Sequence, residues 1–201
     1  MRLRFLAGAV KAVTARCGLL RGTEAVAIIE FAVTLPIMLV LAVGMFDFGG
    51  AFNLKQKLQA TAREGARFAS ASPTNDLALG TPPSVTAIRD LVDSYLKTEG
   101  INDCGLATSP ATPGAQLVWT YTASSGCPGG LSLTLTIDRG NNASFPPVSV
   151  GGVPIYVIST QVTIAYPYQW QFNRVIGLMA PGATYAGTSV ITTTAVVPNM
   201  D

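Results

Sequence analysis

The stretch AVAIIEFAVTLPIMLVLAVGMF, residues 25–46, holds one charged side chain, Glu30, in 22 positions. A run of about 20 apolar residues is long enough to cross a bilayer as a helix. The basic residues on its N-terminal side are Arg2, Arg4, Lys11, Arg16 and Arg21. Because positive charge marks the cytoplasmic side, we predict a cytoplasmic leader at 1–25, a single transmembrane helix at 26–46 and an exported C-terminal part. The span is too long for the apolar core of a cleaved signal peptide.

Two residues inside the span are unusual. A carboxylate such as Glu30 costs about 2–3 kcal/mol or more within a bilayer and is normally paired or functional. Alternatively, Glu30 lies close enough to the cytoplasmic interface to be solvated. Pro36 lacks a backbone N–H, which predicts a kink. That kink is either harmless or part of a packing surface, and the sequence leaves both pairs of alternatives open.

Beyond the span, residues 47–71 continue as an amphipathic helical extension. The residues that recur at spacings of three and four are Leu54, Leu58, Thr61, Ala62, Gly65 and Phe68. This period is typical of a helix with one buried face. Pro73 is expected to end the helix.

Residues 72–201 are predicted to form an exported α+β domain. A short helix is expected at 84–99, capped by Ser84 and closed by Gly100. Period-two alternation then indicates about four antiparallel strands, and a helical turn is expected around 173–179. The expected strands are 117–122, 131–137, 156–166 and a last one within 184–197. The fold class is therefore α+β, with a long N-terminal helix that carries a small antiparallel β-sheet head and one short helix.

Cysteine usage agrees with export. Cys104 and Cys127 flank the first expected strand of the head, whereas Cys17 lies in the leader. In an oxidising compartment Cys104 and Cys127 are natural disulfide partners. The chain contains no histidine and no C-x-x-C motif, so we expect no metal site and no cofactor.

Several function classes find no support in the composition. Without histidine there is no Ser-His or Cys-His nucleophile, and no nucleotide-binding glycine motif follows a strand. We therefore expect no enzyme and no small-molecule substrate. Nucleic-acid binding is also not expected, because the excess of basic charge is confined to the leader and residues 26–201 carry eight basic and ten acidic residues. Asp90 and Asp93 are expected to be solvated. The aromatic segment 166–172 is either a sugar-binding platform or, as we favour, a core or subunit contact.

Residues 21–70 resemble the TadE-type pseudopilins of the tight-adherence (Tad) pilus. The resemblance rests on a combination of short motifs along the helix. These motifs are Glu30-Phe31, Leu35-Pro36, Phe48-Gly49 and the run Ala62, Arg63, Glu64, Gly65, Ala66, Arg67. The resemblance implies a minor pilin-like subunit that acts in pilus biogenesis and surface adhesion from the bacterial inner membrane. Its implied partners are the membrane, a prepilin peptidase, other pilin-like subunits and the pilus assembly platform.

The resemblance also implies a processing site between Ala25 and Val26, which would make Glu30 the fifth residue of the mature chain. Alanine stands there where the family has glycine, and the nearest glycine is Gly22. Glu30, Phe31 and Pro36 would serve subunit assembly, and Glu30 would pair with the new amino group of a neighbouring subunit.

Two other functions remain as alternatives. A major fibre subunit is disfavoured, because Tad-type major pilins are much shorter. The second is an uncleaved bitopic protein whose exported head binds a surface ligand or glycan. Its candidate binding residues are Trp119, Tyr166, Tyr168 and Trp170.

Overall fold

The computed structural model describes residues 23–78, 80–114, 116–170, 172 and 187–200. The chain divides into two units, residues 1–46 and 47–201, which are described separately below. Residues 1–22 of the leader predicted at 1–25, with Cys17, lie outside the described residues, as does the predicted helical turn at 173–179.

The first described element is helix α2, Thr23–Ser70, which contributes to both units. Helical structure continues through Pro36, so the proline does not break the helix. The helix stops at Ser70, three residues before Pro73, as the sequence predicts. The Thr34 hydroxyl donates to the carbonyl of Phe31 at 3.3 Å, an internal hydrogen bond that suits an apolar surrounding.

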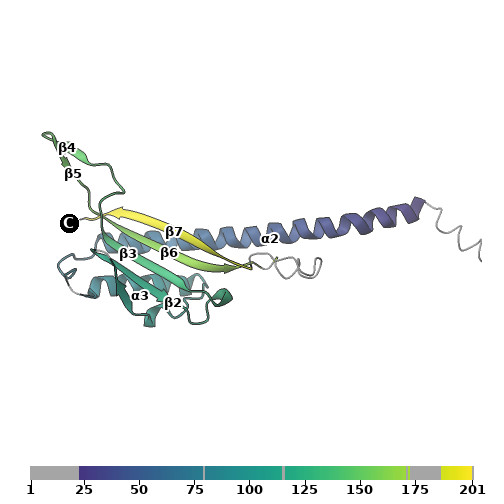
Figure 1. Cartoon of the computed structure of the whole chain (residues 1–201), viewed down its shortest axis with the longest axis horizontal. Helices are drawn as coiled ribbons and strands as arrows, with labels where there is room; N and C mark the ends of the chain where they lie inside the picture. The colour runs from purple at the N-terminus through teal and green to yellow at the C-terminus, as the bar shows by residue number, and fades with distance from the viewer. Residues whose placement is uncertain (1–22, 79, 115, 171, 173–186, 201) are drawn as a thin grey trace, which may run out of the picture. The chain divides into compact units, whose positions relative to one another are not determined.

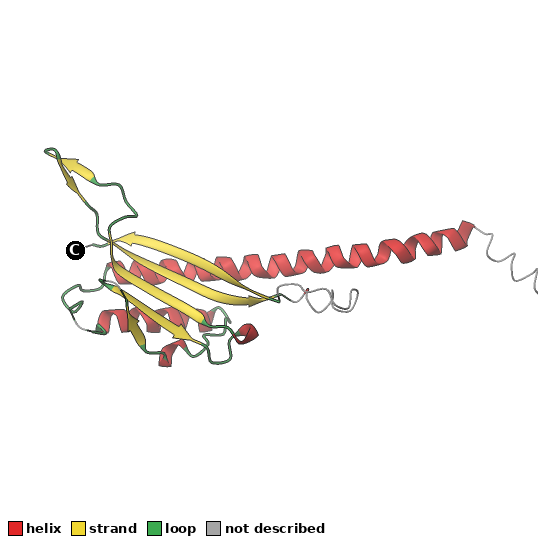
Figure 2. Cartoon of the chain, viewed as in Figure 1, coloured by secondary structure: helices red, strands yellow, loops and turns green. Residues whose placement is uncertain are grey.

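The head contains a five-stranded antiparallel sheet in the order β1-β2-β3-β6-β7 (Figure 1). The strands are β1 (Ala111–Pro113), β2 (Val118–Ala123), β3 (Leu133–Asn141), β6 (Ser159–Gln169) and β7 (Thr188–Pro198). A separate two-stranded hairpin joins β4 (Val148–Val150) to β5 (Val153–Ile155). The predicted α+β class, with a long helix and an antiparallel sheet, is confirmed (Figure 2).

One face of the sheet forms the core together with two helices. Side chains on this face alternate with partly exposed ones, as the burial pattern of β3 shows. The largest are Trp119, Tyr121, Leu133, Leu135, Ile137, Val162, Ile164 and Tyr166. They pack with Leu58 and Ala62 of α2 and with Ile88 and Val92 of α3 (Pro83–Thr98). The head is therefore a two-layer domain with a single hydrophobic core.

The other face of the sheet is rich in threonine. One row crosses all five strands through directly paired positions. Its members are Thr112, Thr120, Thr136, Thr163 and Thr194. The hydroxyls of Thr163 and Thr194 lie 3.1 Å apart. Cross-strand threonine pairs stabilise a sheet by a few tenths of a kcal/mol each, and β-branched residues favour the extended backbone.

Helix α3 differs from its prediction at its start and agrees at its end. Ser84 does not cap it. Instead, the backbone N–H of Ser84 donates to Asp76 at 2.8 Å, and the N-cap position is Pro82. At the other end Gly100 donates to the carbonyl of Lys97 and Ile101 to that of Leu96. This pair of bonds is a Schellman motif, so Gly100 closes the helix as predicted.

Three strands were not predicted from the sequence. β1, β4 and β5 have three residues each, too few for a period of two to emerge. β6 begins at Ser159, so Tyr156 and Ile158, predicted inside it, lie before it and are exposed. Two short 3₁₀ helices, η2 (Leu106–Thr108) and η3 (Pro128–Gly130), complete the head.

Candidate assembly surfaces

None of the described side chains of the apolar segment 26–46 is buried, and most are exposed. Within the described residues this is the one helix long and apolar enough to cross a membrane, with a mean hydropathy of 2.6 in its best window. None of that window is buried inside the structure. Exposed apolar surface on this scale needs lipid or another protein around it. The finding fits the predicted single membrane span.

The residues predicted to act in processing and assembly lie on this exposed segment. Ala25 and Val26 are helical, and the Val26 side chain is exposed. Glu30 and Phe31 are exposed as well, and Pro36 is half-buried. No ion pair or hydrogen bond holds the Glu30 carboxylate among the described residues. Any partner for this carboxylate must therefore come from outside the described part of the chain.

The run from Ala62 to Arg67 has a different place, at the base of the head. Ala62, Gly65 and Ala66 face the core and are buried. A Cβ at Gly65 would lie 3.0 Å from Cγ2 of Val92 on α3 and 3.6 Å from Cγ1 of Val162 on β6. The absence of a side chain at Gly65 therefore sets how closely α2 approaches α3 and the sheet.

The charged members of the same run lie on the opposite side of the helix. Arg63 and Arg67 are exposed and Glu64 is half-buried. Phe68, predicted to join the buried face, is exposed, and Ala69 is buried in its stead. Both positions fit the predicted spacing, because Phe68 and Ala69 lie three and four residues after Gly65, and the periodicity alone does not distinguish them. In this run the small residues give the close contact with the head.

Asp47 is a buried carboxylate that the sequence analysis did not identify. It is 6% exposed, although it follows directly on the apolar run. The backbone N–H of Phe172 donates to Asp47 Oδ2 at 2.6 Å, and the Tyr168 hydroxyl donates to Asp47 Oδ1 at 3.3 Å and to its carbonyl at 3.2 Å. Burial, and secondarily the Asp47 charge, raise the pKa of Tyr168, which keeps the phenol protonated as a donor. We call this group the Asp47 clamp.

An aromatic cluster adjoins the Asp47 clamp. The rings of Phe48 and Trp170 meet edge to face with centroids 5.4 Å apart, and those of Tyr168 and Trp170 at 5.0 Å. Gly50 leaves room for the Tyr168 hydroxyl, which would lie 2.9 Å from a Cβ at that position. The Phe48-Gly49 motif thus lies where the end of β6 reaches α2. The sequence marks the two segments that meet here, although it does not show that they meet. Asp47 is the first charged residue after Glu30, and 166–172 is the most aromatic segment.

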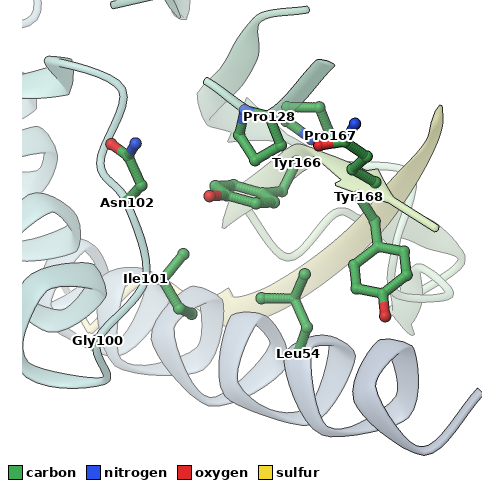
Figure 3. Close-up of a pocket in the computed structure, with 9 residues that line it drawn as sticks. Leu54, Gly100, Ile101, Asn102, Pro128, Tyr166, Pro167 and Tyr168 are labelled. Atoms are coloured by element: carbon green, nitrogen blue, oxygen red, sulfur yellow. The ribbon is translucent and has the colours of Figure 1, made fainter. Parts of the chain in front are cut away.

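A shallow pocket of about 310 Å³ lies between α2, the end of α3 and β6. Leu54 and Ile101 project toward the part of β6 that carries Tyr166 (Figure 3). Asn102 and Gln169 contribute polar groups, and no acidic or basic side chain lines the pocket. This lining is suited to apolar contact and supplies no carboxylate or amine for acid–base catalysis.

The four aromatic residues proposed to bind glycans do not form one platform. Trp119 and Tyr166 are each 4% exposed, and the Trp119 indole donates to the carbonyl of Gly80 at 3.0 Å. Only Tyr168 and Trp170 come together. The predicted platform is wrong because period-two alternation places Trp119 and Tyr166 on the core face of the sheet.

The predicted disulfide is present and lies at one edge of the core. Cys104 and Cys127 are joined across a sequence separation of 23, and both side chains are buried. The bond ties the segment after α3 to the segment before η3. Of the two aspartates predicted to be solvated, Asp90 is exposed as predicted, whereas Asp93 is not. Asp93 is buried rather than solvated, and Lys97 donates to it at 2.7 Å.

Opposing effects act on the pKa of Asp93. Burial raises this pKa, and the hydrogen bond from Lys97 lowers it by a smaller amount. Asp103 lies 3.6 Å from Lys97, and hydrogen bonding from Asp93 together with the Lys97 charge brings the pKa of Asp103 below its ordinary value despite burial. The described residues contain no group of three histidine, cysteine or acidic side chains placed to hold a metal ion.

The hairpin β4–β5 carries a second exposed apolar surface. Its turn, Gly151-Gly152, has positive φ at both residues, as a two-residue type I′ turn requires. The cross-strand pairs Val148–Ile155 and Val150–Val153 share one face of the hairpin. All four side chains are exposed. No charged residue occurs anywhere from position 140 to 173.

Together these features define a protein with one candidate membrane-spanning helix and a disulfide-linked α+β head built on the second part of the same helix. The family of TadE-like proteins matches residues 25–67. The match covers the exposed apolar segment, the Asp47 turn and the small-residue run under the head, and it agrees with the resemblance found in the sequence. Neither a curated protein nor a solved structure matches the chain.

Proposed function

We propose that this chain is a minor pilin-like subunit of a Tad-type pilus apparatus, acting in pilus biogenesis and surface adhesion without an active site. One observation carries the proposal. The TadE-like match at 25–67 coincides with an apolar helix whose side chains have no partner inside the described chain. Pilin-like subunits work by packing such helices against one another, and the exposed segment provides the surface for it.

In this proposal the protein crosses the bacterial inner membrane once. The basic leader stays in the cytoplasm, and the head lies in the periplasm or at the cell surface. The disulfide between Cys104 and Cys127 supports an exported head, because such bonds persist in oxidising compartments. The partners are a prepilin peptidase, other pilin-like subunits and the assembly platform.

The first test is the N-terminal residue of the protein purified from membranes, read by intact mass and peptide sequencing. A chain that begins at Val26 supports processing as a pseudopilin. A chain that begins at Thr23 moves the cut to Gly22 and makes Glu30 the eighth residue. A chain that still carries Arg2 refutes processing and returns the uncleaved bitopic protein as the better description.

The second test concerns Glu30. If its carboxylate pairs with the amino group of a neighbouring mature chain, Glu30→Ala abolishes assembly and leaves membrane insertion intact. Thr34→Ala, one turn further along the same exposed helix, serves as the matched control and retains assembly. Cross-linking of subunits in membranes measures the outcome, and wild-type cross-linking of the Glu30→Ala variant would contradict the pairing.

A further inference from the structure

Helix α2 continues from the span into the head, so it determines how far the first residues of the head lie from the membrane. Residues 31–46 contain no charge, and Asp47 is the next charged residue after them. At about 1.5 Å per residue, Phe48 lies about 3 Å and Phe52 about 9 Å beyond Phe46 along the helix. The polar interfacial layer of a bilayer is about 5–7 Å thick on each side. If residues 26–46 span the membrane, Phe48 therefore lies within this layer, whereas Phe52 lies about 2–4 Å beyond it.

The end of β6 is fixed to this same turn of the helix. Trp170 packs on Phe48, with ring centroids 5.4 Å apart. Tyr168 and Phe172 both donate hydrogen bonds to Asp47. Trp170 and Tyr168 consequently lie at the depth of Phe48, although they are more than a hundred residues away in sequence.

The chemistry of this end of the head suits a membrane–water boundary. Phe48 and Phe52 are 63% and 66% exposed, and one helical turn separates them. The polar atoms of the cluster are already satisfied, since the Trp170 indole donates to the Ser189 hydroxyl at 2.8 Å and Tyr168 donates to Asp47. Tryptophan and tyrosine with an apolar body and a bonded polar tip are the residues enriched at both faces of a bilayer.

Among the described residues, charge does not oppose contact with lipid here. Asp47, the charged residue that the described chain places at this level, is almost fully buried and accepts hydrogen bonds from Tyr168 and Phe172. Residues 140–173, which include the end of β6, are uncharged. A carboxylate left exposed at this depth would disfavour contact between the head and the membrane, and the Asp47 clamp removes that penalty.

We infer that Phe48, Tyr168 and Trp170 form a lipid-contact surface that seats the head in the outer interfacial layer of the membrane, with Phe52 just outside that layer. The inference rests on the proposed membrane anchoring of 26–46. It adds that the head lies against the bilayer and is not held away from it on a bare stalk. Asp47 acts as a positioning residue, because it holds β6 against the helix at this depth.

The two tryptophans of the chain make the inference testable. Trp119 lies in the row of paired residues that includes Val162, eight residues before Trp170 on β6. At about 3.3 Å per residue this is about 26 Å along the strand. β6 follows α2 away from the boundary, since Gln59 of α2 donates to the carbonyl of Thr194, the partner of Thr163. Trp119 is therefore beyond the reach of lipid.

The experiment reconstitutes the full chain into phosphatidylcholine nanodiscs whose acyl chains carry bromine, a contact quencher of tryptophan fluorescence. Trp119→Phe leaves Trp170 as the only tryptophan, and Trp170→Phe leaves only Trp119. A third variant combines both changes with Leu39→Trp, which places a probe inside the span. If Trp119→Phe unfolds the head, the difference between wild type and Trp170→Phe gives the quenching of Trp170.

We expect Trp170 to lose most of its fluorescence to bromines near the headgroup end of the lipid and less to bromines near the terminal methyl. Trp119 should keep its intensity in both lipids, and the probe at position 39 should be quenched most by the deep bromines. Trp170 quenched no more than Trp119, with position 39 still quenched, overturns the inference and leaves the anchor intact. If position 39 also escapes quenching, the span is not in the bilayer and the proposed anchoring fails with it.

Discussion

Gly65 allows a direct test of how the matched helix joins its head. Replacing a glycine by alanine inside a helix normally stabilises a protein by about 0.5–1 kcal/mol. At Gly65 the new Cβ would lie 3.0 Å from Cγ2 of Val92, whereas carbon atoms pack best at about 3.5–4.0 Å. Val92 is fully buried and β-branched, so its side chain has one strongly preferred rotamer in a helix.

The expected magnitude is the difference between two effects. Overpacking a filled core costs about 1–3 kcal/mol, and the helix propensity of alanine returns up to about 1 kcal/mol. Gly65→Ala is therefore expected to lower the free energy of unfolding of the head by about 1 kcal/mol. In a Val92→Ala background the contact disappears, and the same substitution should raise that free energy by about 0.5–1 kcal/mol.

Denaturant unfolding of the full chain in detergent micelles, followed by tryptophan fluorescence, measures these free energies. Ala60→Gly, the reverse exchange at an exposed position of α2, calibrates the helix propensity in this protein. The coupling between Gly65→Ala and Val92→Ala should be about 1–2 kcal/mol. If Gly65→Ala stabilises the head as much as Ala60→Gly destabilises it, the close approach of α2 to α3 is refuted.

Three further predictions concern the head. Cys104→Ala combined with Cys127→Ala should lower the free energy of unfolding by about 3 kcal/mol for a closed loop of this length, and a reductant should do the same to wild type but not to the variant. Burial raises the pKa of Asp93, so its contribution to stability is complete below the ordinary value of 3.8 and is lost as the pH rises past the raised value. Asp93→Asn should flatten that part of a stability profile against pH, and an unchanged profile would count against the burial. Val150→Lys, on the exposed hairpin, should alter the free energy of unfolding by less than about 0.5 kcal/mol, whereas a loss of 2 kcal/mol or more would mean that the hairpin packs on the core.

Much of the fold could be predicted because its elements are long and periodic. Leu133, Leu135 and Ile137 alternate with threonines, and the structure buries all three. Short elements escaped, since three residues of β4 or β5 carry no period. Arg139 shows where the period of two conflicts with residue type. It continues the buried alternation of β3 and is 1% exposed, with Nη2 donating to the carbonyl of Ser72 at 2.9 Å. An arginine is normally expected at the surface of a protein.

The candidate site was predictable only where it depends on local sequence. The exposed span and the small-residue run follow from composition and spacing along one helix. The Asp47 clamp could not be predicted in this way, because Tyr168 and Phe172 are 121 and 125 residues away from Asp47 in sequence. This contact depends on the position of β6 along α2, and packing of the whole core fixes that position. Asp93 was misjudged for a related reason, since packing of the core buries the face of α3 that carries Val92, Asp93 and Leu96.

The matched segment 25–67 is thus one helix with two physical tasks, which change near Asp47. Before Asp47 the apolar side chains have no partner within the described chain, so substitutions there are expected to alter association and leave the stability of the head unchanged. After it, Ala62, Gly65 and Ala66 are buried beneath the sheet, so substitutions there are expected to destabilise the head first. The two halves of the helix therefore respond to different surroundings: the first needs lipid or neighbouring proteins around it, whereas the second is covered by its own domain.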